Sequence, residues 1–576
     1  MKTLYRHIML GAFVALPLMG FAQAPGTMIS GTVSDDIEPL MMVNVVEVDE
    51  ANRIVAHGVT DINGNFSFRI VDPKHRLKIS YVGYATQLIP IKGTRYNIKL
   101  KSNLQLKEVV VKQKRVMQSS GLAIPEREVS VAHQTIDAKE FEGLSLTSID
   151  EALQGRVAGL DIVFNSGDLG AGTTMRLRGV SSINGNTQPL VVVDGNVFES
   201  DYLSGFDFAS ATEEQYSELL NVNPDDIASI TVLKDAGSAA IYGTRGANGV
   251  ILVTTKRGSG EAGKTVVTYD SYIAFNVAKP SPDILSADEF RRSRRGTDYG
   301  ADTDWYGLIT RDVAYDTNQY ISIDGSTKNG FYGASFNYKS ANGLDIVSGR
   351  EEFGGRFSME QRVLENRLQF NGSLSARRVN ETWGNDGFFD RALTMNPTMP
   401  VYNADGSYYQ PTSPTGATNP VAELALRDNN GQRMYLLGTA EAKLNILQTE
   451  KHLLNTTLSY SLHYNDMKQQ YYASSAGSES YWNGYKGRAE MKYQKWYTNR
   501  LEWLGNYALN LGDHNIKAVV GYTYEKSIWE QIGGSNNDFS FDNTKYWDLG
   551  SGSYLKDGLA SLYSGRSEST LIGFFG

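Results

Sequence analysis

The chain has 576 residues, more than one hydrophobic core normally organises, so several domains are expected. Its 57 glycines and 33 tyrosines favour a β-rich protein with many turns over a helical enzyme. A formal net charge of -9, without a long Lys/Arg run, argues against a nucleic-acid partner. The chain has no cysteine, so it can form neither disulfides nor thiolate metal sites.

Residues 1–22 have the pattern of a secretory signal peptide. Lys2 and Arg6 precede the apolar run 8–18, and small residues ending at Ala22 predict cleavage there. A membrane anchor is less favoured, because the run is shorter than the ~20 residues of a spanning helix. No other stretch is apolar enough for such a helix, so a mature protein that lives in a membrane must cross it as a closed β-barrel.

Residues 28–102 predict a small β-sandwich, because short alternating runs are separated by turn-forming residues. Asp61, Asn63 and Asn65 have the spacing of half an EF-hand loop, but the other ligands are missing, so a plain turn is predicted. The segments ISGTVSD, TDINGNFSF and ISYVGYAT resemble a carboxypeptidase-regulatory-like domain.

A β-prone hexamer, LKEVVV, lies between this domain and the next. Its position, with a basic stretch and then Gly121 and Pro125 after it, suits addition to the sheet edge of another protein. A linker, or a last strand of the sandwich, is the alternative interpretation. The hexamer resembles a TonB box, and KQKRVMQ after it leaves the register of the box open. The box residues are Leu106, Lys107, Glu108, Val109, Val110 and Val111.

Residues 120–258 predict a compact α+β domain with long polar loops. Ser148 and Glu151 form a capping box for an amphipathic helix that Gly159 is placed to end. Further on, two apolar β-branched runs flank a short helix that Asp235 caps and Gly243 ends.

Several motifs in this domain occur in a characteristic order: ALQGRVAGL, SGDLGAG with MRLRG, PLVVVDG, and VNPDDIASITVLKDAGSAAIYGTRGANGVILVTTKRG. Together they resemble the plug of a SusC-type (RagA-like) TonB-dependent outer-membrane transporter, which implies a plug inside a large β-barrel. Arg176, Arg178, Arg245 and Asp235 are then expected to pack as ion pairs against the barrel wall or to line the lumen. The plug motif comprises Arg176, Arg178, Gly179, Asp194, Gly195, Lys234, Asp235, Tyr242, Gly243, Arg245, Gly246, Asn248 and Gly249.

Residues 264–576 alternate apolar and polar side chains in runs that approach the ~9 to 11 residues of a tilted transmembrane strand. Leu454, Leu458 and Leu462, for example, alternate with polar residues. Tight joints alternate with long loops at 379–433 and 466–487, as in outer-membrane barrels. Nine or ten strands are expected, against about twenty-two in the resembled family, so the chain is expected to be truncated. A soluble β-sandwich or propeller is the alternative.

Motifs for catalysis or cofactors are weak. Residues 258–265 match a P-loop pattern, but the alternation of Val267, Tyr269 and Ile273 predicts a strand where phosphate binding needs a helix. The seven histidines form no metal-binding pattern, and a pair of acidic residues acting as a glycosidase cannot be judged by counting. No catalytic residue, metal or cofactor is expected.

The sequence thus predicts a mainly β protein with an N-terminal sandwich, an α+β plug and the first part of a transmembrane antiparallel barrel. The resemblance implies TonB-dependent import of an oligosaccharide or oligopeptide across the outer membrane. Its expected partners are a TonB-type energy-transducing complex, a SusD-like surface lipoprotein as lid, and outer-membrane lipid. Two alternatives remain open: a surface binding or adhesion protein without transport, and a secreted β-rich hydrolase. The sequence does not identify the substrate or the residues that bind it.

Overall fold

In the computed structural model the chain forms two compact units, Met1–Gln113 and Lys114–Gly576. The predicted signal peptide and the LKEVVV hexamer lie outside the described residues. The structure describes all residues except 1–24, 36–38, 82–83, 101–114, 119–121, 126–132, 141–147, 165–166, 168, 171–172, 180–187, 199–221, 235–241, 243–244, 257–262, 279–282, 385–386, 412–417, 450, 512–513, 554–559 and 576.

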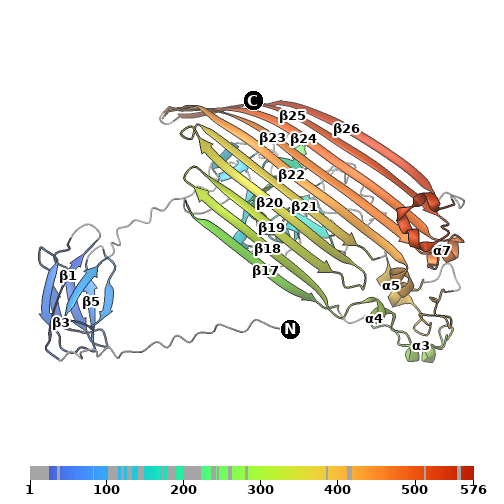
Figure 1. Ribbon diagram of the computed structural model, residues 1–576, viewed down its shortest axis with the longest axis horizontal. Coiled ribbons are helices and arrows are strands. Elements are labelled where there is room, and N and C mark those ends of the chain that lie inside the picture. Colours follow the sequence, from blue (N-terminus) through green and yellow to red (C-terminus); the bar gives the residue numbers. More distant parts are fainter. Residues whose placement is uncertain are drawn as a thin grey trace, which may run out of the picture. The chain divides into compact units, whose positions relative to one another are not determined.

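The first unit is a β-sandwich of two sheets, with the strand orders β4-β1-β7 and β3-β2-β5-β6 (Figure 1). Alternate residues from both sheets, such as Ile29, Phe66 and Leu77, enter one buried core. Its strands are β1 (Met28–Ser34), β2 (Asn44–Val48), β3 (Ile54–Val59), β4 (Asn65–Arg69), β5 (Arg76–Ser80), β6 (Gln87–Pro90) and β7 (Arg95–Lys99).

The turn that resembles half a calcium loop is held by its own hydrogen bonds. The Asp61 carboxylate accepts the backbone N–H groups of Asn63 at 2.9 Å and Asn65 at 2.8 Å. Gly64 has a φ of 73°, which an L side chain rarely adopts. These N–H groups, Asn65 first, hold the pKa of Asp61 below its usual value. The carboxylate therefore already has a structural role in closing the turn.

The second unit contains a five-stranded sheet with the order β10-β15-β16-β13-β14. β13 runs parallel to β16, and the other neighbours are antiparallel. One face packs on α1 and a hairpin of β11 and β12 in a core that includes Ile136, Leu153 and Ile230. The elements are β8 (Arg115–Gln118), β9 (Leu122–Pro125), β10 (His133–Asp137), η2 (Ala138–Glu140), α1 (Ile149–Leu153), β11 (Leu160–Phe164), β12 (Thr173–Leu177), β13 (Leu190–Val193), β14 (Asn196–Phe198), η5 (Pro224–Asp226), β15 (Ile227–Leu233) and β16 (Val250–Thr255).

Helix α1 is shorter than the sequence predicts. Ser148 caps its start and accepts the N–H of Glu151, as expected, but the helix ends at Leu153 instead of continuing to Gly159. Gly155 already has a φ of 71°, and the Arg156 guanidinium donates to the carbonyl of Ala152 at 2.8 Å. A left-handed glycine and a side-chain donor at the last carbonyls end the helix one turn early.

The rest of this unit is a ten-stranded antiparallel sheet in which each strand pairs with its neighbours in chain order (Figure 1). This confirms the predicted fold class and the expected nine or ten strands. The strand that follows the P-loop-like pattern is the first of the sheet, as the alternation predicts. The strands are β17 (Thr265–Asn276), β18 (Ala314–Thr327), β19 (Gly330–Asn342), β20 (Gly349–Val363), β21 (Leu368–Thr382), β22 (Arg427–Gln448), β23 (His452–Ala473), β24 (Arg488–Leu511), β25 (His514–Asn537) and β26 (Ser561–Phe575).

Connections at the two ends of this sheet differ in length. At one end, residues 328–329, 364–367, 449–451 and 512–513 join consecutive strands. At the other end the connections are 277–313, 343–348, 383–426, 474–487 and 538–560. The long ones carry α3 (Ala287–Ser293), α4 (Trp305–Ile309), α5 (Phe388–Thr394), α6 (Pro420–Ala425), α7 (Ser478–Asn483), η7 (Asp542–Trp547) and η8 (Leu549–Ser551).

The strands are longer than the alternating runs in the sequence, and the predicted loops are correspondingly too long. β21 continues to Thr382, β22 begins at Arg427, and β23 continues to Ala473. Main-chain pairing does not require an apolar face, so the strands continue where both faces become polar. Alternation therefore marks only the part of each strand that has one apolar face.

The two faces of β23 show this alternation. Leu458 is 50% exposed on the outer face, whereas its neighbour Thr457 is 1% exposed on the inner face. The described part of the chain includes no helix that is both long enough and apolar enough to cross a membrane.

We predict that residues 25–100, expressed alone, fold without metal or disulfide, because their core and turns are self-contained. A cooperative thermal transition by circular dichroism is expected. A random-coil spectrum, or folding only after calcium is added, would contradict this.

We also predict that Leu458→Cys and Thr457→Cys differ in thiol accessibility, because the two side chains lie on opposite faces of one strand. In membranes, a water-soluble thiol reagent should modify the outer position at least about tenfold more slowly than a lipid-soluble reagent of equal reactivity. At position 457 this preference should be absent. Equal preference at both positions would show that the register is wrong.

Candidate functional site: the contact between plug and wall

We call the domain built around the five-stranded sheet the plug. The hairpin that joins β13 to β14 brings a carboxylate to its edge. Its two turn residues, Asp194 and Gly195, have φ values of 49° and 87°, as a tight Asp-Gly hairpin requires. The Asp194 carboxylate accepts the backbone N–H of Thr255 at 3.0 Å and also the hydroxyl of that residue. The turn is therefore fixed to the end of β16.

Arg356 on β20 joins this turn to the ten-stranded sheet, which we call the wall. Its guanidinium donates to Asp194 at 3.2 Å, to the carbonyl of Lys256 at 2.9 Å, and to the Thr255 hydroxyl. The side chains of Arg356 and Asp194 are only 10% and 11% exposed. Removing one member of a buried charged pair typically costs ~3 to 5 kcal/mol, because the other charge is left without compensation. We call these residues the Arg356 anchor.

A second contact lies at η5, immediately before β15. The buried Asp226 carboxylate accepts the hydroxyls of Tyr320 at 3.0 Å and Ser335 at 2.7 Å, from β18 and β19. Its neighbour Asp225 accepts the side-chain amide of Asn318 at 2.8 Å. Burial raises the pKa of Asp226, although the Ser335 hydroxyl and the nearby Arg356 charge oppose that shift. We call this contact the Asp226 anchor.

Both anchors lie at the same end of the plug sheet. Asp226 immediately precedes β15, Thr255 is the last residue of β16, and Asp194 immediately follows β13. Since β15 is antiparallel to β16 and β13 is parallel to it, these three points meet at one end. The plug sheet is thus held by one end against strands β18 to β20.

A third contact joins the plug to a distant part of the wall. The Arg245 guanidinium donates to the Glu525 carboxylate on β25 at 2.8 Å, and the Glu525 side chain is 5% exposed. Arg245 thus forms an ion pair with the wall, one of the two roles expected for it. Four strands, β21 to β24, lie between this contact and the Arg356 anchor in the order of the sheet.

A plug loop also lies against a charged ladder on the wall. Arg350 contacts Glu381 and, at 3.3 Å, Glu352, while Arg433 lies 3.4 Å from Glu381. A Cβ built on Gly170, which has a φ of 77°, would collide with Arg350. Backbone alone therefore fits at this position, which explains the glycine at residue 170.

Strand β10 is an edge strand of the plug sheet in the described part of the chain, and local contacts hold it there. Gln134 donates to the carbonyl of Arg156 at 2.7 Å and accepts from the Lys234 ammonium at 3.0 Å. Across the strand pair, the hydroxyls of Thr135 and Thr231 are 2.9 Å apart. Lys234, one of the motif residues, therefore fastens the edge strand to the rest of the plug. Its hydrogen bonds within the described part of the chain are to Gln134 and Ala158, both plug residues.

Other motif residues support the plug itself. Tyr242 is buried in the core on the second face of the sheet. Gly249 has a φ of 90°, and a Cβ on it would collide with Leu177. Gly246 accepts the N–H of Gly249 at 3.0 Å through its carbonyl, in a turn that contains Asn248.

The remaining predicted residues are distributed over the plug. Arg176 lies on β12 opposite Asp161, and Arg178 with Gly179 follows that strand in left-handed conformations with φ values of 60° and 94°. Asp235 and Gly243 lie outside the described residues.

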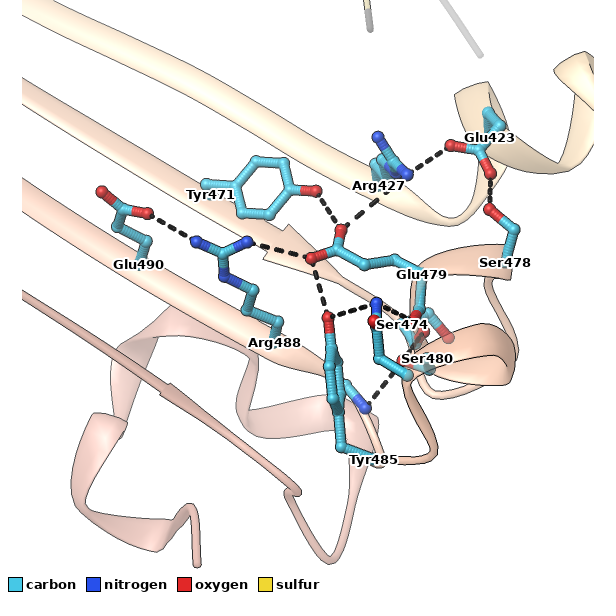
Figure 2. A network of polar contacts seen from close by, with 12 residues as sticks. Glu423, Arg427, Tyr471, Ser474, Ser478, Glu479, Ser480, Tyr485, Arg488 and Glu490 are labelled. Atoms are coloured by element: carbon cyan, nitrogen blue, oxygen red, sulfur yellow. Dashed lines mark hydrogen bonds and ion pairs between the residues drawn. The ribbon is translucent and has the colours of Figure 1, made fainter. Parts of the chain in front are cut away.

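At the long-loop end of the wall, polar contacts converge on Glu479 (Figure 2). Its carboxylate accepts the hydroxyls of Tyr471 at 2.7 Å and Tyr485 at 2.8 Å, and the Arg488 guanidinium at 3.1 Å. Burial alone would raise the pKa of Glu479, but these donors, with the Arg427 charge, hold the pKa below its usual value. The carboxylate stays charged and fixes α7 to strands β23 and β24.

The long loops also share an apolar cluster. Trp305 of α4, Phe388 of α5 and Leu424 of α6 are buried together, and the Trp305 indole donates to the carbonyl of Asn396 at 3.0 Å. Around these packed loops, Tyr402 and Trp547 remain 52% and 68% exposed. The loops are thus structured supports that present aromatic side chains to solvent.

The residues of the ten-stranded sheet that contact the plug were not identified from the sequence. Arg356, Tyr320 and Ser335 lie on ordinary alternating strands, and their pattern does not distinguish them from other inward-facing residues. Glu525 shares that property. No group of three or more His, Asp or Glu side chains suited to a metal ion occurs among the residues the structure describes.

Family comparisons match two regions of the chain. The TonB-dependent Receptor Plug Domain matches residues 125–250, and the CarboxypepD_reg-like domain matches residues 29–111. TonB-dependent receptor SusC of Bacteroides thetaiotaomicron is 29% identical over 611 residues, covering 99% of this chain and 56% of SusC. TonB-dependent receptor P26 of Formosa agariphila is 29% identical over 568 residues, covering 95% of this chain and 54% of P26.

Among solved structures, the RagAB peptide importer in its open-open state shares the fold with a TM-score of 0.64 and 20% identity. The similarity covers 80% of this chain and 54% of the matched chain. The chain spans about half the length of these relatives. The two domain matches and the similarity to SusC and P26 over nearly the whole of this chain support a SusC-type TonB-dependent receptor, and its fold is shared with RagAB.

Proposed function

We propose that this chain belongs to an outer-membrane importer of oligosaccharides or oligopeptides, in which a periplasmic TonB-type partner moves the plug. The observation that carries the proposal is a plug fastened by a few polar contacts to the polar inner face of a sheet whose outer face is apolar. That arrangement closes a lumen with a removable part. A receptor that only binds a ligand at the surface has no need of it.

The position of β10 supports force entering from the N-terminal side of the plug. Its first residue, His133, pairs with Leu233, at the end of the sheet opposite the anchors. The hexamer Leu106–Val111 precedes β10 in the chain. Tension from that side would separate β10 from β15 one pair at a time while the anchors hold β15 and β16.

The proposals for the cargo and the outer partner are based on the long connections at one end of the ten-stranded sheet. The structural relative RagAB is a peptide importer, and the fixed loops with exposed Tyr402 and Trp547 suit stacking on sugar rings or peptide side chains. We assign the same surface of packed loops to a SusD-like lipoprotein acting as lid. By this proposal the short connections face the periplasm and the chain performs no catalysis.

We predict that Val110→Pro in the full-length protein abolishes energised uptake, because proline removes a donor that strand addition to the partner needs. Uptake of labelled oligosaccharide and oligopeptide mixtures measures the loss, and surface levels and ligand binding at the cell surface should stay at parental values.

Deletion of residues 106–111 is the decisive companion variant. If uptake continues without the hexamer, the segment is a linker and the proposed coupling is wrong. If the parent binds ligand but never imports it, the protein is a surface binder or adhesin.

A second prediction concerns the edge strand. Thr135→Cys with Thr231→Cys places two thiols directly across β10 and β15, and oxidation should lock the pair and stop uptake until a reductant is added. Ser229→Cys with Thr254→Cys is the matched control, because it joins β15 to β16, which the anchors already hold. Uptake that persists with the first pair fully oxidised would show that β10 does not move.

A further inference from the structure

A cavity of about 440 Å³ separates the plug from the inner face of the wall. On the plug side it is bounded by the Asp194–Gly195 turn, Asn196 and Tyr242. On the wall side it is lined by polar residues of strands β20 to β24, among them Ser373, Thr439 and Ser461. Cavities of this size accommodate small ligands, and polar lining keeps such a space filled with water.

Strand register explains why the cavity forms there. One cross-strand row runs Ser358, Ser373, Thr439, Ser461, Arg500 and Glu525, from β20 to β25. Its first four members have small hydroxyl side chains. The row begins two residues from Arg356 and ends at Glu525, so a plug contact lies at each end. The plug is therefore fastened on both sides of a stretch of wall in which four consecutive members of this row carry small hydroxyl side chains.

The cavity lies on one defined side of the Arg356 anchor. β20 runs from its long-loop end at Gly349 to the short connection after Val363, and the lining residues Ser358 and Arg362 follow Arg356 in that direction. The cavity is thus on the short-connection side, and the anchor separates it from the long loops.

Its lining favours an uncharged ligand that forms many hydrogen bonds. A second row of facing residues, Asn371, Glu441 and Ser459, adds amide, carboxylate and hydroxyl groups. Asn371 already donates to Glu441 at 2.7 Å, and the hydroxyls of Ser373 and Thr439 are 2.7 Å apart. Four cationic side chains and three acidic ones line the same space, and two of the cations are already paired, Arg356 with Asp194 and Arg500 with Glu502. Sugar hydroxyls and peptide amides share the chemistry that such a surface can bind.

We propose that this cavity is the inner part of the path that cargo takes between plug and wall, along β21 to β23, and that the Arg356 anchor closes its outer side. The cargo class is a neutral hydrogen-bonding chain, either an oligosaccharide or an oligopeptide. This inference rests on the proposed import function. It adds where the cargo passes and which wall residues it meets.

The test narrows the cavity reversibly. The chain contains no cysteine, so Ser461→Cys provides a single thiol in its centre. A bulky methanethiosulfonate reagent should modify it and lower uptake at least about tenfold, and reductant should restore the rate. The uptake rate of unmodified Ser461→Cys is the reference against which the modified protein is compared. Leu458→Cys, on the outer face of the same strand, is the matched control and should transport normally after reaction with a lipid-soluble form of the reagent.

Uptake is measured separately with a mixture of neutral oligosaccharides and with a mixture of neutral oligopeptides. The mixture that the parent protein imports identifies the chemical class of the cargo. Normal uptake with position 461 fully modified, or failure of the water-soluble reagent to reach this thiol, would overturn the path. Deletion of residues 106–111 separates the two proposals, because uptake that survives this deletion contradicts the coupling itself. Import of neither mixture by the parent would overturn both.

Discussion

The ion pair between Arg356 and Asp194 is the interaction on which the arrangement of plug and wall depends. Each group is nearly buried, so each needs the other to offset the loss of hydration. Because the same guanidinium also reaches Thr255 and the carbonyl of Lys256, it fixes the ends of two plug strands at once. The Asp226 anchor secures a third strand at the same end of the sheet.

These attachments give the plug two mechanically different parts. β15, β16 and β13 are each fixed beside the wall, whereas β10 depends on main-chain pairing with β15 and on the contacts of Gln134, Thr135 and Ile136. The Arg245 contact holds the plug on its far side, and the small hydroxyl side chains between the two attachments leave water-accessible space along the wall. The same contacts thus hold the plug in place and leave space beside the wall for the proposed cargo path.

Sequence alone predicts the parts of this structure that follow local rules. Alternation identifies strands such as β23, where Leu458 and Thr457 lie on opposite faces, and the Asp61 turn follows from its own side chains. Strand ends are not predictable in the same way, because pairing continues to Ala473 after the alternation fades. Helix α1 ends early because Gly155 and Arg156 act together, and the capping pattern at its start carries no information about that.

The candidate site is predictable only on the plug side. Asp194, Lys234 and Arg245 belong to recognisable motifs, but Arg356 and Glu525 come from strands 162 and 280 residues away from their partners. Nothing local marks them, since the wall curves around the plug only after the whole sheet has formed. Two of the three motif residues meet the wall, and Lys234 holds the edge strand instead.

By this proposal, β10 moves while β15 and β16 stay anchored. The most direct test is site-resolved hydrogen exchange of the plug in the outer membrane, with and without the energised periplasmic partner. The difference between the anchored strands and the edge strand predicts that amides of β10 exchange on the order of tenfold faster when the partner is energised, while amides of β15 and β16 stay protected. Equal acceleration across all three strands, or none in β10, would contradict it.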